Sequence, residues 1–528
     1  MKTLRDIERM LSQGKINRRE FLTRVSAMGL TAALSPALLS IPANAAVPQK
    51  GGLFRIGADG GSTSDSLDVR QLVSVMSQHL SSQLRNNLVE LNDQTRAVPE
   101  LAESWEPSAD AVTWIFKLRQ GVEFHNGKTM DAEDVLYSIN LHRGEDSKSS
   151  VKVLLDQVDS IKADTKDTVV FTLKAGNADF PFVLSQYNFG IVPKGTTDFE
   201  AGIGTGPYML EKHEPGVRCK VKRNPNYWKA GRAHFDAVET MTINDVQART
   251  NALKTGQIDV MNRPDLKTIH LLEKTANLNL TRIEGTQHIT IPMRTDTSPF
   301  DNNDVRLGLK LALDREQVLK NVLRGYGAIG NDTVISPAYR YFASELEQRT
   351  YDPDKAKYHL KKGGAADQKF KLHVADAAFT GAIDTALIYK ENATKAGIDI
   401  EVVKEPNDGY WSNVWMKKAW CFSWWYGRPT EDWVFSTAYA ADAAWNETYW
   451  KHERFNKLLL EARSELDETK RRNMYVQMQQ IQRDEGGTLV PVFPNYLMVA
   501  SNKLQHDVVA PNFEWDGFKI CERWWFGS

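Results

Sequence analysis

The sequence predicts a protein of the α/β class. Residues 371–426 alternate strand-like and helix-like runs in the order β-α-β-α-β. Two segments nearer the N-terminus, 113–118 and 169–173, alternate apolar and polar residues as half-buried strands do, and a helical segment lies between them. The chain has 528 residues, which is too long for one simple core and indicates two or three structural units.

The first 45 residues have the features of an export signal. Residues 17–22 form a twin-arginine pattern that contains Arg18 and Arg19, an uncharged stretch covers 25–41, and Ala43-Asn44-Ala45 is a small-x-small cleavage site. At roughly 17 residues the stretch has the minimum length for a transmembrane helix, so a retained membrane anchor is the weaker alternative. We expect a twin-arginine signal peptide over residues 1–45 and a soluble periplasmic protein beginning near Ala46.

A small mixed α/β unit is expected between residues 85 and 195. The strands at 113–118 and 169–173 flank a helix at 132–140. Asp131 stands directly before this helix and is a candidate N-cap, because its carboxylate can accept the free N–H groups of the first turn.

The mature chain is expected to open with a strand at 52–57, followed by a loop of small residues at 59–64. Further along, apolar residues recur at helical spacing from Asp304 to Leu323. The spacing predicts one helix over this segment, with Asn302 or Asn303 as its cap.

The clearest pattern lies in the second half of the chain. Strands are expected at 371–374, 398–403 and 420–426, with helices at 383–396 and 408–418 and Gly397 ending the first helix. This order implies parallel strands joined by right-handed crossovers. Ligands of such sheets bind beyond the carboxyl ends of the strands, and the third strand ends in residues 424–428.

Composition and charge exclude several classes of partner. Beyond the first 45 residues, which contain seven basic and three acidic residues, the chain has 59 basic and 64 acidic residues. This mildly acidic part of the chain lacks the excess of basic residues that is typical of nucleic-acid-binding proteins. The cysteines Cys219, Cys421 and Cys521 lie far apart and form no metal motif, so we expect no metal site; one disulfide or buried free thiols remain open.

No motif of a common enzyme class is present. The sequence lacks GxGxxG, GxxxxGK[ST], HExxH and GxSxG, and its 11 histidines are scattered singly. We therefore expect a protein that is not an enzyme and has no cofactor. An exported hydrolase or cofactor enzyme remains the rival class, because twin-arginine export often delivers folded cofactor enzymes.

One constellation fits a pocket for a small ligand. Alternation along the third strand places Trp424 and Tyr426 on one face and Trp425 on the other. Gly427 permits close backbone approach, and Arg428 offers a planar fork of donors suited to carboxylate or phosphate. The structural alternative is an edge strand on which Arg428 pairs with its acidic neighbours Glu431 or Asp432; Asp432 is also a candidate ligand contact.

Motifs along almost all of the mature chain resemble the family 5 extracellular solute-binding proteins, which include binding proteins for dipeptides, oligopeptides, nickel chelates and opines. Each motif is weak alone, but all occur in the family's order. The motifs lie at 99–105, 116–122, 124–127, 204–208, 223–228, 253–259, 305–315 and 351–356.

The resemblance implies a two-lobed periplasmic-binding-protein fold of cluster C. Lobe one is expected at 46–295 with 496–528, including an extra α/β subdomain at about 85–195, and lobe two at 296–495. The lobes would close over a solute, and an ABC permease with its ATPase would read the closed form. We expect a monomer that delivers a small-molecule solute to this importer. A peptide chaperone or signalling receptor on the same scaffold is a further alternative.

One departure from the family pattern bears on the ligand. Peptide binders of this family carry an Asp in a GDPDN-like segment, where it holds the amino terminus of the peptide. Here residues 427–432 match that segment and Arg428 replaces the Asp. The segment, with Met293 and Arg294, is closer to opine-type members. We therefore expect a peptide- or opine-like solute whose carboxylate or phosphate is held by Arg428.

Further ligand contacts are proposed at positions where a structural role is equally open. Met293 and Arg294 end an alternating strand near the hinge, and Asn188 lies in a loop expected to face the cleft. The remaining candidates are Ser62 and Thr63, which follow the first strand, and Trp411, which opens a helix in lobe two. The sequence leaves the identity of the solute open among peptides, opines, sugar acids and phosphodiesters.

Overall fold

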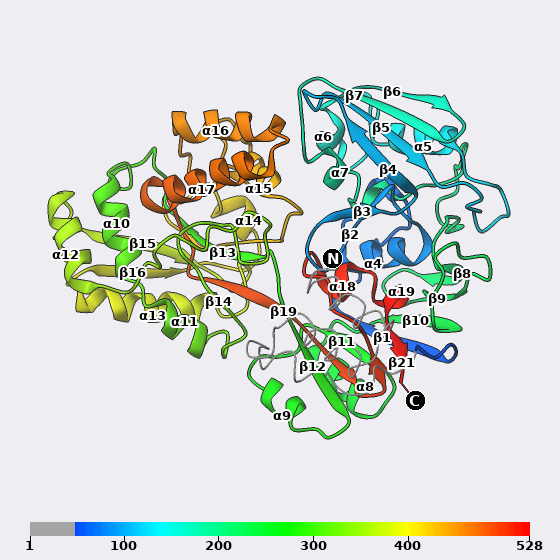
Figure 1. The fold of residues 1–528 in the computed structure, drawn as a ribbon. Helices are drawn as coiled ribbons and strands as arrows, with labels where there is room; N and C mark the ends of the chain where they lie inside the picture. Colours follow the sequence, from blue (N-terminus) through cyan, green and yellow to red (C-terminus); the bar gives the residue numbers. More distant parts are fainter. Residues whose placement is uncertain (1–47, 528) are drawn as a thin grey trace, which may run out of the picture.

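The structure, a computed structural model that describes residues 48–527, contains two lobes connected by two chain crossings (Figure 1). The expected signal peptide, residues 1–45, lies outside the described residues. No helix within 48–527 combines the length and the apolar character needed to cross a membrane.

Lobe one is built on a large mixed sheet. β1 (Leu53–Ala58) lies at its centre and runs parallel to both neighbours, β10 (Ala237–Thr242) and β11 (Val260–Asn262). The order along the sheet is β12-β19-β11-β1-β10-β9-β8, with antiparallel pairing elsewhere. The remaining strands are β8 (Tyr208–Glu214), β9 (Arg218–Arg223), β12 (Leu278–Glu284) and β19 (Val492–Ser501).

Helices and the C-terminal segment complete the core of lobe one. The described residues place α4, α8 and α9 against this sheet region, and the last residues fold back so that Trp515 and Trp524 pack in one cluster with Phe54 and Ile56. The bounds are α4 (Val75–Leu84), α8 (Val246–Lys254), α9 (Ile269–Glu273), β20 (Leu504–Gln505), α18 (Glu514–Gly517), α19 (Ile520–Arg523) and β21 (Trp525–Phe526).

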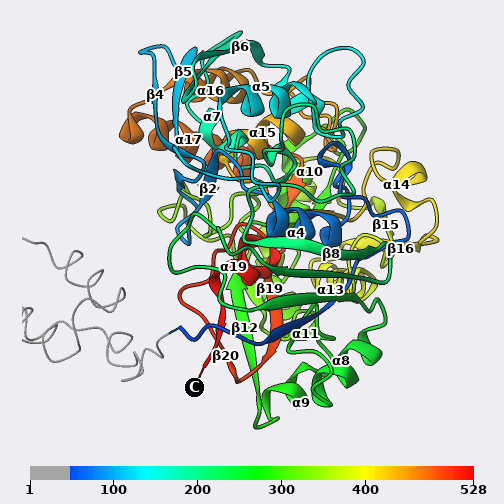
Figure 2. The same ribbon diagram turned by 90° about the vertical axis from the view of Figure 1, so that its right-hand side faces the viewer.

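A smaller α/β subdomain extends from lobe one, as Figure 2 shows above the large sheet. Its antiparallel sheet has the order β4-β5-β7-β6, and α5 begins with a capping box in which Asp131 and Asp134 each accept the other's backbone N–H. Both predicted strands, the helix and its cap are confirmed. The elements are β2 (Val89–Leu91), β3 (Ala97–Pro99), β4 (Ala102–Pro107), β5 (Thr113–Leu118), α5 (Ala132–Asn140), α6 (Lys152–Leu155), β6 (Val158–Thr165), β7 (Thr168–Leu173) and α7 (Phe180–Val183), with short 3-10 turns η1 (Val69–Gln71) and η2 (Tyr187–Phe189).

The predicted β-α-β unit forms the centre of lobe two. β15 (Lys369–Val374) and β16 (Asp399–Lys404) are parallel, and α13 (Ala382–Lys395) connects them. Gly397 follows the helix with φ +76°, a left-handed conformation that favours glycine and ends the helix as predicted. The core beneath consists of apolar residues of these elements and of α10 (Asn303–Leu311), α11 (Arg315–Asn321) and α12 (Pro353–Lys362).

The rest of the predicted β-α-β-α-β run is shorter than expected. In place of a helix over 408–418 there is one turn, α14 (Tyr410–Asn413), because Met416 adopts φ +59° and stops further helical winding. The third strand divides: Cys421 bridges β15 in parallel, whereas β17 (Ser423–Trp425) pairs antiparallel with β13 (His288–Pro292). β18 (Thr488–Leu489) pairs with the other end of β13.

Three further helices cover the remaining side of lobe two, and α16 and α17 pack against each other (Figure 1). Their apolar residues form a separate cluster with Trp425, Tyr439 and Trp450. The helices are α15 (Glu431–Ala438), α16 (Glu453–Ser464) and α17 (Glu468–Glu485).

The two crossings run side by side. The first is the segment 285–287 between β12 and β13; the second is β19, whose first residues pair with β14 (Gly327–Ile329) and whose later residues pair with β12 and β11. The lobe boundary was expected at 295, but β13 hydrogen-bonds to strands of lobe two, so the structure groups residues 288–292 with that lobe.

All three cysteines are buried free thiols. Burial raises the pKa of Cys219 to about 12. Of the two readings left open by the sequence, the structure therefore shows the free thiols.

Candidate functional site

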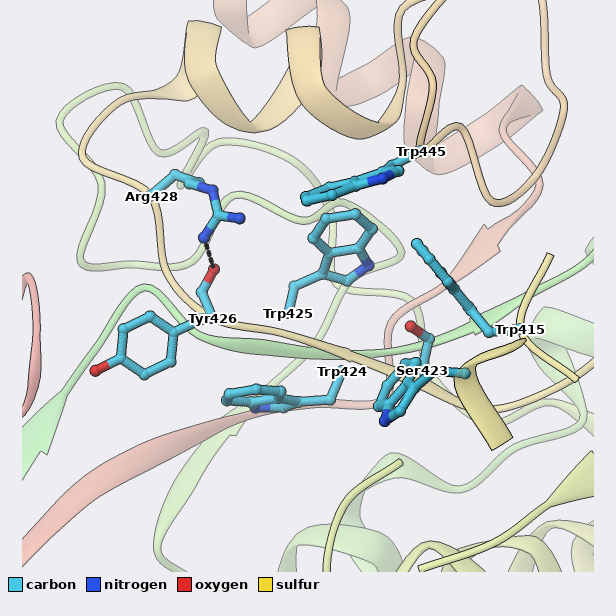
Figure 3. A pocket seen from close by; sticks show the side chains of 8 residues that line it. Trp415, Ser423, Trp424, Trp425, Tyr426, Arg428 and Trp445 are labelled. Carbon is cyan, nitrogen blue, oxygen red and sulfur yellow. Dashed lines mark hydrogen bonds between the residues drawn. The ribbon is translucent and has the colours of Figure 1, made fainter. Parts of the chain in front are cut away.

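An aromatic cavity of about 290 Å³ lies at the end of β17 in lobe two. It is formed by the strand residues themselves, by α14 and the turn that follows it, and by one residue from the loop after α15. Figure 3 shows these side chains gathered around the strand. The lining residues are Trp411, Trp415, Ser423, Trp424, Trp425, Tyr426, Arg428 and Trp445. A wall that is almost entirely aromatic around one guanidinium suits an organic ligand with an anionic group.

Glu447 anchors the indoles on the inner side of the strand. The indole Nε1 of Trp415 donates to Glu447 Oε2 at 2.8 Å, and the indole Nε1 of Trp425 donates to Oε1 at 3.1 Å. The hydroxyl of Thr290 also donates to Oε1, at 2.8 Å. Burial raises the pKa of Glu447, while these donors favour the carboxylate. The network fixes the planes of both rings.

Arg428 is half-buried at the edge of the cavity. Its Nη1 donates to the backbone oxygens of Tyr426 at 3.1 Å and Gly427 at 3.4 Å (Figure 3). Among residues 48–527, no carboxylate oxygen lies within 4.0 Å of the guanidinium; the sequence alternative, a pair with Glu431 or Asp432, is not formed. The positive charge acts on Tyr187 of lobe one: burial raises the pKa of that phenol and Arg428 opposes the rise.

A second cavity of about 430 Å³ lies between the lobes and shares Trp424 with the first. Lobe one contributes Arg263 and Glu514, which form an ion pair at 2.7 Å. Lobe two contributes the loop that follows β15, at the carboxyl end of that strand, where ligands of parallel sheets bind. Its lining residues are Arg263, Pro264, Leu266, Gln287, residues 376–380, Trp424, Asn495, Tyr496, Leu497 and Glu514. The two cavities therefore adjoin each other at Trp424.

The side chains of β17 and of the residue after it point alternately to opposite faces. Tyr426 turns toward lobe one, where it stacks on Phe513 with ring centroids 5.8 Å apart, and it lies next to Trp424 at 5.7 Å. Trp425 faces the opposite side, toward Trp415. The faces expected for these three residues are therefore confirmed.

Gly427 approaches the first crossing. A Cβ at this position would stand 1.8 Å from the hydroxyl of Thr286 and 2.8 Å from its Cβ. The close backbone approach expected at Gly427 is therefore made to the crossing segment 285–287, and it couples the aromatic strand to the connection between the lobes.

The side chains of Asp432 and Asn188 form hydrogen bonds with other residues of the protein. Asp432 lies in α15, where the guanidinium of Arg463 donates to its carboxylate at 3.1 Å. The amide of Asn188 is fully buried and donates to the backbone oxygen of Val69 at 2.8 Å. Neither residue lines the two cavities. A direct ligand contact by either one stays a prediction.

Four other expected contacts also lie outside the cavities. Met293 is fully buried and bridges the backbone of Trp420. Arg294 forms a salt bridge with Asp296 at 2.8 Å. Ser62 and Thr63 lie exposed in the loop after β1, where the Ser62 hydroxyl is 2.9 Å from that of Ser64. The structure thus brings together Trp411, Trp424, Tyr426 and Arg428 of the predicted set.

Sequence reasoning missed several residues of the site. Trp415 stands four positions after the predicted Trp411, a spacing that would place both on one helix face, so a signal for Trp415 was available. Trp445 and Glu447 follow α15 in an irregular segment, and no local pattern connects them with β17.

One cluster of carboxylates has spacing compatible with a metal ion. It consists of Glu90, Glu100 and Glu522 in lobe one. Three cations occupy the surroundings: Lys229 contacts all three carboxylates, Lys519 lies 2.6 Å from Glu100, and Arg523 lies 2.6 Å from Glu90. Because the negative charge is already compensated, we assign this cluster to a structural ion-pair network.

Comparison with known proteins gives a consistent result. Residues 96–447 match the family model of bacterial extracellular solute-binding proteins, family 5 Middle. The chain is 26% identical over 451 residues to the dipeptide-binding protein of Escherichia coli (strain K12). The aligned region covers 77% of this chain and 83% of that protein.

Solved structures share the fold. The ABC transporter-associated periplasmic binding protein DppA from Helicobacter pylori, in complex with the peptide STSA, has a TM-score of 0.75 at 22% identity and covers 91% of this chain and 99% of its own. The PBP AgaA from A. tumefaciens R10, in complex with agropinic acid, has a TM-score of 0.73 at 21% identity and covers 90% of this chain and 99% of its own. The two-lobed fold expected from the sequence is confirmed.

Proposed function

The chain belongs to the bacterial extracellular solute-binding proteins of family 5, and on this premise we propose that it captures an organic solute with an anionic group between its lobes for an ABC importer. Proteins of this family bind solutes and are not catalysts. The solute that we propose is peptide- or opine-like, and its carboxylate or phosphate is held by Arg428.

One observation carries the proposal: an arginine without a carboxylate partner at the edge of an aromatic cavity. Within residues 48–527 the guanidinium donates only to the backbone oxygens of Tyr426 and Gly427, which directly precede it, so most of its donors are free for a ligand. Trp411, Trp424 and Tyr426 would contact the apolar part of the solute. The peptide and agropinic acid in the related folds support a ligand of this size.

The proposal has three further parts: the protein is exported by the twin-arginine pathway, it delivers its solute to a membrane permease and its ATPase, and it acts as a monomer. These features rest on the sequence pattern of residues 1–45 and on family membership. The division into two lobes is also part of it: lobe one was expected at 46–295 with 496–528 and lobe two at 296–495, and we now put the first boundary at the crossing 285–287.

A thermal-shift screen tests the anion. Peptides, opines, sugar acids and phosphodiesters are tested beside their amides or esters, because a ligand bound only by the folded state raises the melting temperature. We expect acids to stabilise the protein and their neutral derivatives to do so far less. Loss of a hydrogen-bonded charge in Arg428→Ala should weaken binding about 10- to 100-fold.

The matched control is Arg454→Ala. Arg454 is exposed on α16, lies outside both cavities, and donates to the side chain of Gln477. This variant should bind as the wild type does. Tight binding of simple dipeptides that survives Arg428→Ala would contradict the proposal.

A further inference from the structure

Three indole rings in the aromatic cavity form three sides of a box. The ring centroids of Trp415 and Trp425 are 6.0 Å apart with planes at 69°, those of Trp415 and Trp445 are 6.4 Å apart at 68°, and those of Trp425 and Trp445 are 6.0 Å apart at 50°. Trp445 is 48% exposed and Trp411, which adjoins Trp415, is 43% exposed. Large aromatic surface is thus exposed beside the cavity.

This spacing fits a cation held against several ring faces. A cation centre about 4.5 Å from two perpendicular rings, which is within the ~6 Å reach of a cation–π contact, requires centroids about 6.4 Å apart. The three observed separations are close to this value. Rings that only filled a core would be covered by other side chains, whereas Trp445 remains half exposed.

The carboxylate of Glu447 lies behind two of the rings and is 1% exposed. It accepts the N–H groups of Trp415 and Trp425, which draws negative potential toward the indoles. Within residues 48–527, no Lys, Arg or His nitrogen stands within 4.0 Å of it, whereas most buried carboxylates of this chain have a cationic partner. Hydrogen-bond donors, and not a cation, therefore surround the acidic group at this end of the cavity.

We propose that the indole box binds an alkylated ammonium group, and that the solute is a zwitterion whose carboxylate reaches Arg428. The cavity then offers a negative end at Glu447 with its indoles and a positive end at Arg428. An alkylated ammonium suits the box better than a primary amine, because it needs few hydrogen bonds and the indole faces offer none. This inference rests on the proposed function, since it names the class of solute for the same site.

Pairs of isosteres separate charge from shape. Trimethylglycine and 4-(trimethylammonio)butanoate are titrated calorimetrically beside 3,3-dimethylbutanoate and 5,5-dimethylhexanoate, in which carbon replaces the ammonium nitrogen. Tetramethylammonium chloride tests the box alone. We expect a betaine of matching length to bind at least tenfold more tightly than its carbon isostere, which lacks the positive charge. Trp445→Leu should remove that preference, and Trp433→Leu, a control outside both cavities, should keep it.

The outcomes distinguish the two levels of the proposal. Equal affinity of a betaine and its isostere, both still dependent on Arg428, would overturn the ammonium site and leave the anion site standing. Affinity that is independent of Arg428 would overturn the proposed function. If no betaine and no tetramethylammonium bound at 10 mM, the ammonium site would also be overturned.

Discussion

His288 is a buried imidazole directly behind the aromatic strand. It pairs with Trp425 across β13 and β17, and the two rings are nearly parallel at 12°. Burial, together with the positive charge of nearby Arg428, lowers the pKa of His288 to about 3. Neither ring nitrogen has a hydrogen-bond partner within the described residues. The native state therefore keeps this imidazole neutral.

This histidine should make the protein sensitive to acid. An unfolded chain takes up a proton at this residue near pH 6.5, and the native state does so only near pH 3, so the free energy of unfolding falls as the pH drops between these values. Replacing the residue, as in His288→Phe, should remove about 1.4 kcal/mol per pH unit from that slope between pH 6 and pH 4. Urea unfolding at several pH values measures the slope; parallel curves for variant and wild type would refute the assignment.

The residues of the aromatic site differ in how far the sequence predicts them. Trp424, Tyr426 and Arg428 lie on one strand and its end, so the two-residue period of a strand is enough to group them. Trp445 and Glu447 join them only through tertiary folding, from an irregular segment without a period of its own. Asn188 and Met293 were expected as contacts because of their place in the chain, which cannot show that their side chains are buried.

At the scale of elements, the segment 303–321 shows that an N-cap residue can start a new helix within a continuous pattern of apolar residues. The apolar spacing from Asp304 to Leu323 predicts one helix, but α10 ends at Leu311 and α11 begins at Arg315. Asp314 is extended, and its carboxylate accepts the backbone N–H of Gln317 at 3.1 Å. Because Ala312 and Leu313 continue the apolar pattern, periodicity alone cannot detect the break; the Asp followed by Gln three residues later was the available signal.

Removal of this cap should destabilise lobe two. Asp314→Ala leaves the N–H groups of the first turn of α11 without a side-chain acceptor, and we expect the free energy of unfolding to fall by about 1 kcal/mol. In Asp314→Asn the side-chain oxygen can still accept the backbone N–H of Gln317, so the free energy of unfolding should fall much less. Thermal and urea unfolding measure both changes. Equal losses in the two variants would show that the cap hydrogen bond is not the cause.

At the scale of the whole molecule, a buried ion cluster joins the subdomain to lobe two. Asp179, just before α7 in the subdomain, lies 2.9 Å from Arg340 and 2.7 Å from Arg471, and its side chain is 3% exposed. Burial would raise the pKa of Asp179, but the charges of Arg471 and Arg340 outweigh it and lower the pKa to about 2. This contact crosses between the lobes, and sequence patterns give no sign of it, because Asp179 is more than 150 positions from either arginine.

Other contacts accompany the cluster at the same interface. The guanidinium of Arg340 lies over the ring of Phe182 at 4.9 Å, and the hydroxyl of Thr95 donates to the backbone oxygen of Ala338 at 3.0 Å. Glu468 also lies 3.8 Å from Arg340 and from Arg96, but its side chain is 62% exposed, so Asp179 is the buried carboxylate that Arg340 and Arg471 share. If the carboxylate of Asp179 were removed, Arg471 would lose its ion pair and Arg340 would keep only the longer contact with the exposed Glu468.

We therefore expect Asp179→Asn to separate the lobes. Breaking a buried pair on one side costs about 3–5 kcal/mol, and the lobes can relieve this cost by opening, which returns both arginines to water. Small-angle scattering of the ligand-free variant should show a larger radius of gyration than the wild type. Glu345→Gln is the control, since it removes the pair of Glu345 with Arg472 at 2.8 Å within lobe two and should leave the radius unchanged. An unchanged radius in Asp179→Asn would mean that the other contacts of the interface hold the lobes together without the ion cluster.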